Sequence, residues 1–394
     1  MNDSINPEIL KPAVQEFLHE HLKDDLQKLI LKGSPFPNIT VQELAIQIEG
    51  KNKSEKKLPT WFKSKGILFP PKLNLEQASS ELTAKYKASL INKGRLIDLT
   101  GGFGIDDFAF ADRAEKVFHC EINETLSAIV SNNAKVLKKD NIEFIIGDSQ
   151  KFLAKTQKVE TIYVDPSRRA NSGRVFLLED CEPDVLKHKD LYLQKAGTVI
   201  IKAAPMLDIS AAVKSLKNVQ EVHVVSLNNE CKELLFVLKK TPAGFIKYYC
   251  TLLKGDDVNV YEFDEKQEKT LEIQPQKLQN YLYEPDAAIL KAGFFKSLCP
   301  KFGVDKIHQH SHLYTSTELK ADFPGKIFKV MDSFDFNQFT KSKALAKANV
   351  VTRNFNLKPE EIKKQFKIKD GGEDFLFFTT NFKNNLIVVH AKRV

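Results

Sequence analysis

The sequence contains few of the residues that build disulfide frameworks or metal sites. Its 394 residues include five scattered cysteines, and no two of them form a CxxC pair. This pattern is typical of a reducing compartment and argues against a structural zinc site. No stretch is apolar and long enough to cross a membrane, and the first residues, MNDSINPEIL, lack the basic and then apolar pattern of a secretion leader. We therefore expect a cytoplasmic protein that binds neither a metal nor a membrane.

Acidic residues are outnumbered by basic ones, and the imbalance is concentrated near one end. The formal net charge is +8, and residues 301–394 contain 17 Lys and Arg against 10 Asp and Glu, a balance of +7. A basic C-terminal part favours a polyanionic partner, with RNA as the first candidate. A solubilising surface rich in lysine explains the same charge equally well.

Residues 1–74 show helical rather than strand periodicity. The apolar spacing predicts one helix over 12–31 and a second over 41–48, with Thr40 as N-cap and Glu43 completing a capping box. The polar residues 50–57 predict an exposed turn, and a further helix is expected over 75–90. These patterns predict a helical N-terminal domain over 1–74.

From Arg95 to about Lys240, strands and helices alternate, which predicts an α/β fold with a mostly parallel sheet covered on both faces. The last two strands, 221–226 and 233–238, are joined by a loop too short for a crossover and should form an antiparallel hairpin. We therefore predict a Rossmann-like catalytic domain over 75–241. Beyond it, short strands alternate with helices, including predicted helices over 285–298 and 341–348. This pattern predicts a small α+β, ferredoxin-like module over 242–310 and a further small domain over 311–394.

A glycine-rich turn follows the first strand of this domain. Residues 95–104 read RLIDLTGGFG, and 105–114 suit a helix. Units of strand, turn and helix bind the adenosine end of nucleotide-like cofactors, because the glycines let the backbone approach the ligand and the helix start offers free N–H groups. The dinucleotide fingerprint GxGxxG would need a third glycine where Asp107 stands, which disfavours a dehydrogenase.

Four acids follow successive strands, at the ends that line the ligand crevice of such a sheet. Asp98 is placed to meet the α-ammonium group of S-adenosylmethionine, Glu121 the two ribose hydroxyls and Asp148 the adenine amino group, while Asp165 opens a later motif. Any one polar residue at a strand end is commonplace, but four in register with a glycine turn predict a cofactor site. The predicted cofactor residues are Asp98, Thr100, Gly101, Gly102, Phe103, Gly104, Glu121, Asp148 and Ser149.

The motifs DLTGGFG, Glu121, IIGDS and DPSRR, in this order, resemble those of class I S-adenosylmethionine-dependent methyltransferases. The segments YEPDAAILKAGFF (Tyr283–Phe295) and ANVVTRNFNLKPEEIKKQFKIKDGGEDFLFFTT (Ala348–Thr380) are similar to the THUMP-like C-terminal domain of a bacterial group of these enzymes. The resemblance implies the class I methyltransferase fold, S-adenosylmethionine as cofactor and a THUMP-like domain over 311–394. Because THUMP and related domains bind tRNA or other structured RNA, it also implies an RNA partner, tRNA or rRNA.

The fourth motif, DPSRR (residues 165–169), carries the expected chemistry. In base-amine methyltransferases its aspartate and proline are followed by a second proline and an aromatic ring that stacks on the base, whereas here Ser167 and Arg168 stand there. Covalent transfer to C5 of uracil needs a cysteine after the fifth strand, where this sequence has Lys202 and alanines. We therefore expect non-covalent transfer to a nucleobase nitrogen, with Asp165 orienting the acceptor or taking its proton. The catalytic candidates are Asp165, Pro166, Ser167 and Arg168, and either Arg168 or Arg169 would hold a phosphate or a base edge.

Several basic residues lie close together near one predicted C-terminal helix. They are candidates for phosphate contact, together with Arg169: Arg353, Lys358, Lys363, Lys364 and Lys367. A solvated helix face explains their spacing as well. Two other functions stay open, an RNA-binding protein with a vestigial methyltransferase domain, which the altered fourth motif suggests, and a methyltransferase that acts on a substrate other than RNA.

Overall fold

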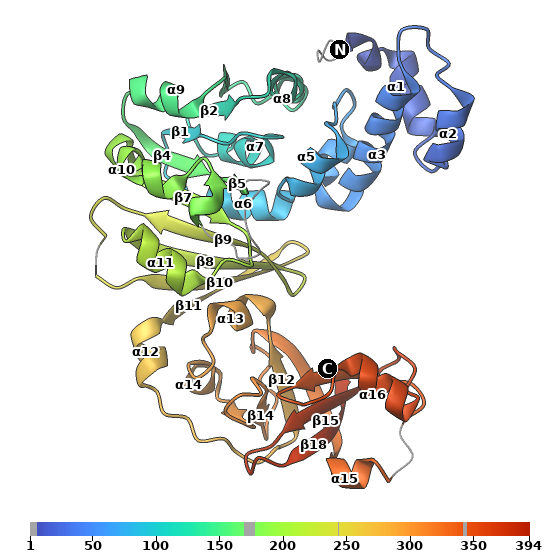
Figure 1. The fold of residues 1–394 in the computed structure, drawn as a ribbon, viewed down its shortest axis with the longest axis vertical. Coiled ribbons are helices and arrows are strands. Elements are labelled where there is room, and N and C mark those ends of the chain that lie inside the picture. Colours follow the sequence, from blue (N-terminus) through green and yellow to red (C-terminus); the bar gives the residue numbers. More distant parts are fainter. Residues whose placement is uncertain (1–5, 169–177, 243, 342–344) are drawn as a thin grey trace. The chain divides into compact units, whose positions relative to one another are not determined.

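The computed structural model describes residues 6–168, 178–242, 244–341 and 345–394 (Figure 1). The chain divides into two compact units, Met1–Gln220 with Leu235–Gly244, and Glu221–Leu234 with Phe245–Val394. The first unit contains the four acids that follow strands. The second unit contains the basic residues near the C-terminus that are predicted to contact RNA, whereas Arg169, the other residue predicted to do so, belongs to the first unit. Within the described ranges, no helix combines the length and apolar character that a membrane span requires.

The first unit begins with short helices, as the sequence predicts for this part of the chain. The predicted helix over 12–31 is two helices, because Asp25 interrupts it and its side chain caps the second one by accepting the N–H of Gln27. The helices are η1 (Pro7–Leu10), α1 (Pro12–Glu20), α2 (Leu26–Lys32), α3 (Val41–Lys57), α4 (Pro59–Lys63), α5 (Lys72–Gln77) and α6 (Glu81–Ser89).

Helix α3 begins with the predicted capping box between Thr40 and Glu43, which is confirmed. The helix continues to Lys57, so the predicted turn over 50–57 is wrong. Gly50 is buried inside the helix, and a Cβ atom there would lie 2.4 Å from Cβ of Phe69. The glycine is therefore required by a close side-chain contact and not by a turn.

The predicted helix over 75–90 is also two helices, α5 and α6, separated by Ser79 and Ser80. Ser80 ends the gap because its hydroxyl caps α6 by accepting the N–H of Thr83. Helices α7 (Ile105–Ala111) and α8 (Glu124–Val136) share an apolar core with the N-terminal helices, in which the ring of Trp61 packs edge-on against Phe108 with centroids 5.1 Å apart.

The sheet of the first unit has the strand order β9-β7-β4-β1-β2-β3, and β4, β7, β1, β2 and β3 pair in parallel. This is the predicted mostly parallel α/β fold. Its strands are β1 (Arg95–Asp98), β2 (Lys116–Glu121), β3 (Ile142–Ile146), β4 (Val159–Val164), β7 (Ala196–Ala203) and the C-terminal part of β9 (Glu230–Leu238). The remaining elements are α9 (Ser149–Lys155), β5 (Ser167–Arg168), η2 (Leu178–Asp180), β6 (Cys181–Glu182), α10 (Val185–Lys195) and α11 (Ile209–Leu216).

The second unit contains the hairpin between β8 (Val219–Leu227) and β9, joined by Asn228 and Asn229. Both asparagines have positive φ, 53° and 65°, as the two central residues of a tight hairpin turn require. Strand β10 (Lys247–Lys254) pairs in parallel with β8, and β11 (Asp257–Asp264) pairs with β10 in antiparallel. The predicted domain limit at 242 therefore separates β10 and β11 from the strand with which they share a sheet.

The rest of the second unit is built on a seven-stranded sheet with the order β13-β14-β12-β15-β18-β17-β16. Along β17, Leu376 and Phe378 belong to one apolar cluster and Phe377 to another, so the sheet is covered on both faces. Of the predicted helix over 285–298, only Ala287–Ala292 is helical, because Gly293 ends it with φ of 84°, and the next helix begins at Leu298. The predicted helix over 341–348 is wrong for residues 345–348, which are not helical and in which Lys347 forms an isolated bridge with Lys369, while residues 342–344 lie outside the described residues.

The elements of this part are α12 (Glu265–Thr270), β12 (Tyr281–Pro285), α13 (Ala287–Ala292), α14 (Leu298–Phe302), β13 (Asp305–Lys306), β14 (Tyr314–Ser316), β15 (Gly325–Asp335), α15 (Phe336–Phe339), β16 (Asn349–Arg353), α16 (Pro359–Phe366), β17 (Asp374–Thr380) and β18 (Leu386–Arg393). Helix α16 has Pro359 in its first turn, where the missing N–H of proline costs no hydrogen bond.

Candidate active site

A cavity of about 1030 Å³ opens at the carboxyl ends of the parallel strands in the first unit. The nine residues predicted to bind a cofactor all line it, and so do Asp165 and Ser167 from the fourth motif. Pro166 is not among the lining residues. Arg168 is the second residue of β5, whose partner is β6, and Arg169 lies outside the described residues. The sequence therefore placed the nine cofactor candidates around one space.

Two glycines of the turn leave no room for a side chain. A Cβ atom on Gly104, whose φ is 73°, would lie 2.5 Å from Val130, and a Cβ atom on Gly101 would lie 2.3 Å from Cε1 of His119. Helix α7 begins directly after Gly104. The turn thus packs tightly on its own scaffold and exposes its backbone on the cavity side, as a loop that cradles a ligand must.

A buried Asp107–His119 pair lies under the turn, and the sequence did not predict it. Nδ1 of His119 is 2.6 Å from Oδ2 of Asp107, and both side chains are fully buried. Burial lowers the pKa of His119 and raises the pKa of Asp107 well above its ordinary value. The available signal was Asp107 itself, because a carboxylate in place of the third glycine needs a buried partner.

Asp98 and Asp165 are linked through Thr100. The N–H and the hydroxyl of Thr100 both donate to Oδ1 of Asp98, at 2.8 and 3.0 Å, and the hydroxyl oxygen accepts the N–H of Asp165 at 2.7 Å. Burial, helped by the charge of Asp107, raises the pKa of Asp98 well above its ordinary value. A cation bound beside Asp98 would favour its ionised form.

Glu121 and Asp148 are both held by backbone N–H groups. Glu121 accepts the N–H of Gly102 at 2.9 Å on one carboxylate oxygen and the N–H of Asn123 at 2.7 Å on the other. Each oxygen has a second lone pair, so the fixed carboxylate can still accept from a ligand hydroxyl. Oδ1 of Asp148 caps α9 by accepting the N–H groups of Gln150 and Lys151, which gives this residue a structural function as well.

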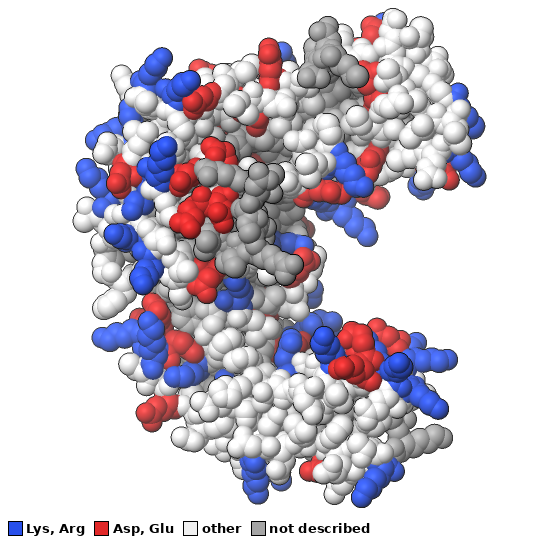
Figure 2. Space-filling view, in the orientation of Figure 1, with Lys and Arg blue, Asp and Glu red and all other residues white. Residues whose placement is uncertain are grey.

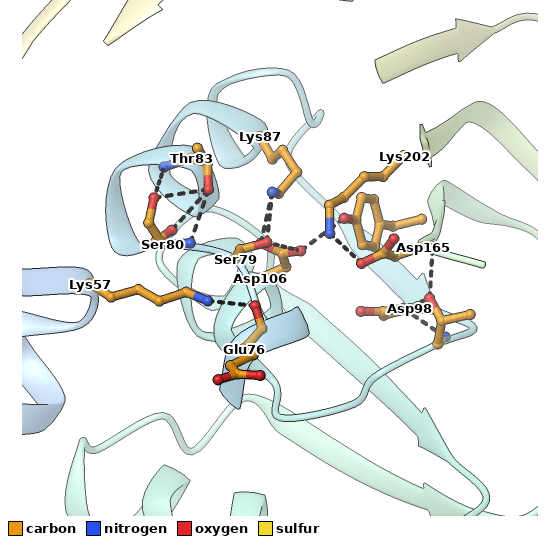
Figure 3. Close-up of polar contacts among 12 residues, drawn as sticks. Lys57, Glu76, Ser79, Ser80, Thr83, Lys87, Asp98, Asp106, Asp165 and Lys202 are labelled. Carbon is orange, nitrogen blue, oxygen red and sulfur yellow. Dashed lines mark hydrogen bonds and ion pairs between the residues drawn. The ribbon is translucent and has the colours of Figure 1, made fainter. Parts of the chain in front are cut away.

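An ion pair between Lys202 and Asp165 lies in the cavity wall. Lys202, near the end of β7, donates from Nζ to Oδ2 of Asp165, and Figure 3 shows the two side chains directed at one another. The Lys202 side chain is 13% exposed and that of Asp165 is 35% exposed. The fourth motif thus presents a carboxylate with an ammonium group against it.

Asp106 is the centre of a second buried group next to this pair. Its Oδ2 accepts the hydroxyls of Ser79 at 3.0 Å and Tyr163 at 2.8 Å, and its Oδ1 is 3.2 Å from Nζ of Lys87, whose side chain is fully buried (Figure 3). Burial alone would raise the pKa of Asp106, but the charges of Lys87 and Lys202 and the hydroxyl donors hold it below its ordinary value.

The helical N-terminal part contributes directly to the cavity wall. Asn74 and Gln77 of α5 line it, together with Ala78 and Ser79 from the gap before α6. The sequence predicted only a helix over 75–90. The interruption at Ser79 and Ser80 is what brings these side chains to the cavity, and the Ser-Ser pair in the sequence was its only sign.

The basic residues predicted to contact RNA differ in their surroundings in the second unit. Arg353 donates to the buried carboxylate of Glu284 at 2.6 Å, and Lys363 pairs with Asp370 at 2.9 Å. Lys358, Lys364 and Lys367 are exposed. On the face shown in Figure 2, basic and acidic side chains are interspersed on both units and do not form one basic surface.

Comparison with known proteins follows the same division of the chain. A ferredoxin-like domain family matches residues 281–324 and a THUMP domain-like family matches residues 325–393. The crystal structure of a proposed methyltransferase from Porphyromonas gingivalis W83 is 30% identical, covers 99% of this chain and 100% of its own, and superposes with a TM-score of 0.88. The chain belongs to this family of class I methyltransferases with a THUMP-like C-terminal domain. Among curated proteins, none matches the sequence.

Two more distant structures match part of this chain. The SMU.1697c protein of Streptococcus mutans in complex with SAH is 16% identical over 41% of this chain and 97% of its own, with a TM-score of 0.31. The tRNA m1G37 methyltransferase of M. jannaschii is 16% identical over 41% of this chain and 50% of its own, with a TM-score of 0.30.

The boundary between the two domains matched by the family models lies at the start of β15, after residue 324. The sequence analysis predicted this boundary after residue 310.

Proposed function

We propose that this protein is an S-adenosylmethionine-dependent methyltransferase that methylates a nucleobase nitrogen of a structured RNA, tRNA or rRNA. One observation carries the proposal. The predicted cofactor residues and the catalytic candidate Asp165 border a single cavity, and Thr100 connects the two groups by hydrogen bonds. A site of this kind can hold a methyl donor and an acceptor side by side.

The chemistry of the cavity fits the cofactor. The glycine turn offers backbone at close range, and the acids Asp98, Glu121 and Asp148 stand where an ammonium group, two hydroxyls and an amino group can donate to them. When bound, S-adenosylmethionine supplies an electrophilic methyl group on a positively charged sulfur. Burial raises the pKa of the Asp98 carboxyl, and an ammonium group bound beside it would favour the ionised form that holds that group.

Non-covalent transfer is supported by the state of the cysteines. Burial raises the pKa of the Cys231 thiol to about 11, and burial also raises the pKa of Cys120. A thiol with a raised pKa is a poor nucleophile at neutral pH, because the thiolate is the reactive form. Asp165 is then the group in the cavity that can orient an acceptor nitrogen and take its proton.

Binding of the cofactor is tested by titrating the whole protein with S-adenosylmethionine and S-adenosylhomocysteine in a calorimeter. We expect both to bind, and we expect Glu121→Gln to weaken binding about ten-fold or more, because a hydrogen bond to a charged group contributes about 1.5–3 kcal/mol. Glu143→Gln is the matched control, since Glu143 is an exposed acid on the neighbouring strand, away from the cavity. Absence of binding, or equal loss in both variants, would contradict the proposal.

The RNA substrate is tested with total RNA from cells that lack the gene, incubated with the protein and methyl-labelled cofactor. We expect label in a tRNA or rRNA fraction. A triple variant of the exposed lysines, K358Q, K364Q and K367Q, should weaken RNA binding and flatten its salt dependence. The control variant K23Q, K28Q and K32Q removes three exposed lysines from the N-terminal part of the chain and should do neither. Cofactor binding without any transfer to RNA would favour a non-RNA substrate or a vestigial domain.

A further inference from the structure

The cavity presents one exposed aromatic ring to a ligand, and the fourth motif does not supply it. Among the described residues that line the cavity, three have aromatic rings: Phe103, Tyr163 and His188. Phe103 is 4% exposed, and Tyr163 is 1% exposed and donates its hydroxyl to Asp106. His188 of α10 is only half-buried. A flat ligand in the cavity can therefore stack on the ring of His188 and on neither of the other two.

The ring of His188 is supported from below by a second ring. Tyr192 follows one turn later in α10, and the two rings lie 25° from parallel with their centroids 6.2 Å apart. The side chain of Tyr192 is fully buried and so provides a fixed support. No described residue forms a hydrogen bond or an ion pair with the imidazole of His188. The ring is thus oriented by packing and remains available to a ligand.

Helix α10 is joined to the fourth motif by a short ladder. Ser167 of β5 pairs with Glu182 of β6, and both residues line the cavity. The chain then passes through Pro183 into α10, which brings His188 to the same cavity that Asp165 lines. The acid of the fourth motif and the exposed ring therefore belong to one connected part of the wall.

A planar base can be held by its edge and by its face. A carboxylate such as that of Asp165 meets the edge, and an aromatic ring meets the face. We propose that the ring of His188 stacks on the acceptor nucleobase and holds it beside Asp165. This proposal rests on the proposed function and names the residue that positions its acceptor. It applies to any base, because every base has a face on which a ring can stack.

The adenine of the methyl donor is the other nucleobase that would enter this cavity. Ile122 follows Glu121 directly, lines the cavity and is 78% exposed. An apolar side chain next to the acid proposed to hold the ribose gives the adenine a surface to lie on. The donor therefore has a contact for its base without His188, which leaves the ring to the acceptor.

Stacking on His188 can be observed directly by NMR of the protein with isotope-labelled histidine. The protein is first loaded with S-adenosylhomocysteine, so that the place of the donor is filled. Among the nine histidines, the ring signals of His188 are those that His188→Phe removes. On addition of the four ribonucleoside monophosphates we expect these signals to move upfield, because a stacked base shields the protons above its face. Signals that stay in place would overturn the proposal.

Methyl transfer to total RNA from cells that lack the gene tests the same contact. His188→Gln keeps a hydrogen-bonding group and removes the ring, and we expect it to raise the RNA concentration for half-maximal rate about ten-fold or more, as loss of a base–aromatic stack does. His188→Phe keeps a ring without its nitrogens and should recover most of this loss. Wild-type behaviour of His188→Gln, or an equal loss in His188→Phe, would overturn the proposal.

Calorimetry with S-adenosylmethionine separates the two sources of a stacked base. We expect both variants to bind the cofactor as the wild type does. Weaker cofactor binding in His188→Gln, with an unchanged requirement for RNA, would place the adenine of the donor on His188 and overturn the assignment to the acceptor. His19→Ala removes an exposed histidine of α1 that does not line the cavity, and as the control it should change neither measurement.

The proposed function and this inference fail in different ways. If the wild type binds no S-adenosylmethionine, or transfers no label to RNA, the proposed function fails and the assignment of His188 fails with it. If the wild type methylates RNA and the ring of His188 has no effect, only the stacking contact is overturned.

Discussion

The cavity has two parts that are built in different ways. We call the part proposed to hold the methyl donor the donor side, and the part proposed to meet the methyl acceptor the acceptor side. The donor side consists of consecutive residues, Asp98 to Gly104, and of acids that follow the next two strands in the chain, Glu121 and Asp148. The acceptor side brings together residues that are far apart in sequence, from Ser79 to Lys202. Backbone N–H groups hold the donor-side carboxylates, whereas side chains from other elements hold Asp165 and Asp106.

The two sides depend on different parts of the chain. Donor-side geometry depends on the place where one strand ends and the next helix begins, so it needs few contacts with distant residues. Acceptor-side geometry depends on charged pairs between residues that are far apart in sequence.

Asp165→Asn is expected to have the largest effect, because it should impair the acceptor side and leave the donor side unchanged. The amide can still accept from Lys202 but cannot take a proton, so we expect kcat to fall about 10²–10⁴-fold, the usual contribution of a general base. Calorimetry should show unchanged affinity for S-adenosylmethionine. Asp190→Asn, on an exposed side chain of α10, is the control and should keep full activity. Equal loss of cofactor binding would mean that the two sides are not separable.

Lys87→Met is expected to lower the free energy of unfolding by breaking a buried ion pair on the acceptor side, without touching the donor side. It leaves the carboxylate of Asp106 buried without its nearest cation, and breaking a buried pair typically costs about 3–5 kcal/mol. Urea unfolding measures this loss. The double variant with Asp106→Asn should recover part of it, because the unpaired charge is then removed. A loss in the double variant equal to the sum of the single ones would show that the pair does not interact.

Gly101→Ala tests the donor side through packing. The added methyl group would lie 2.3 Å from Cε1 of His119, which is fully buried and held by Asp107. We expect a loss of about 1–3 kcal/mol in the free energy of unfolding, typical of overpacking, and weaker binding of the cofactor. Gly197→Ala in β7 is the matched control, since its nearest neighbour would lie 3.5 Å away. Equal losses of stability at both glycines would contradict the claim that close packing in the turn requires a glycine at position 101.

The smallest expected effect is a gain in stability from Asp98→Asn, on the order of 1 kcal/mol. The pKa of Asp98 is raised in the folded protein, so the folded state binds this proton more tightly than the unfolded chain. The contribution of Asp98 to stability is therefore present below its unfolded pKa and is lost as pH rises toward its folded pKa. Over that pH range the free energy of unfolding of the variant should rise relative to that of the wild type, as measured by urea unfolding at several pH values. Its affinity for the cofactor should fall. A constant difference across pH would contradict the assignment.

The sequence predicted for a physical reason that the cofactor candidates lie around one cavity. Residues at the carboxyl ends of parallel strands share one edge of the sheet, so Asp98, Glu121 and Asp148 could be brought together from their order in the chain. The hairpin at Asn228 and Asn229 was recognisable because a short link allows only antiparallel neighbours.

The remaining features depend on contacts that leave no local pattern. Gly50 resembles a turn residue until Phe69 is seen against it, and β10 resembles the start of a new module until its pairing with β8 is known. The Lys87–Asp106 pair joins a helix of the N-terminal part to α7, and nothing in the spacing of these two residues indicates it. The Ser-Ser interruption before α6 and the acid at Asp107 are the two local signals of the buried groups beside the cavity.

Thr100 gives the two halves of the cavity a shared hydroxyl. That hydroxyl has one proton, which goes to Asp98, and its oxygen accepts the N–H that positions Asp165. A cation bound beside Asp98 would favour its ionised form, strengthen its pull on the Thr100 proton and make the Thr100 oxygen a better acceptor for the N–H of Asp165. If the proposed methyl donor supplies that cation, its binding would also fix the backbone of Asp165 on the other side of the cavity.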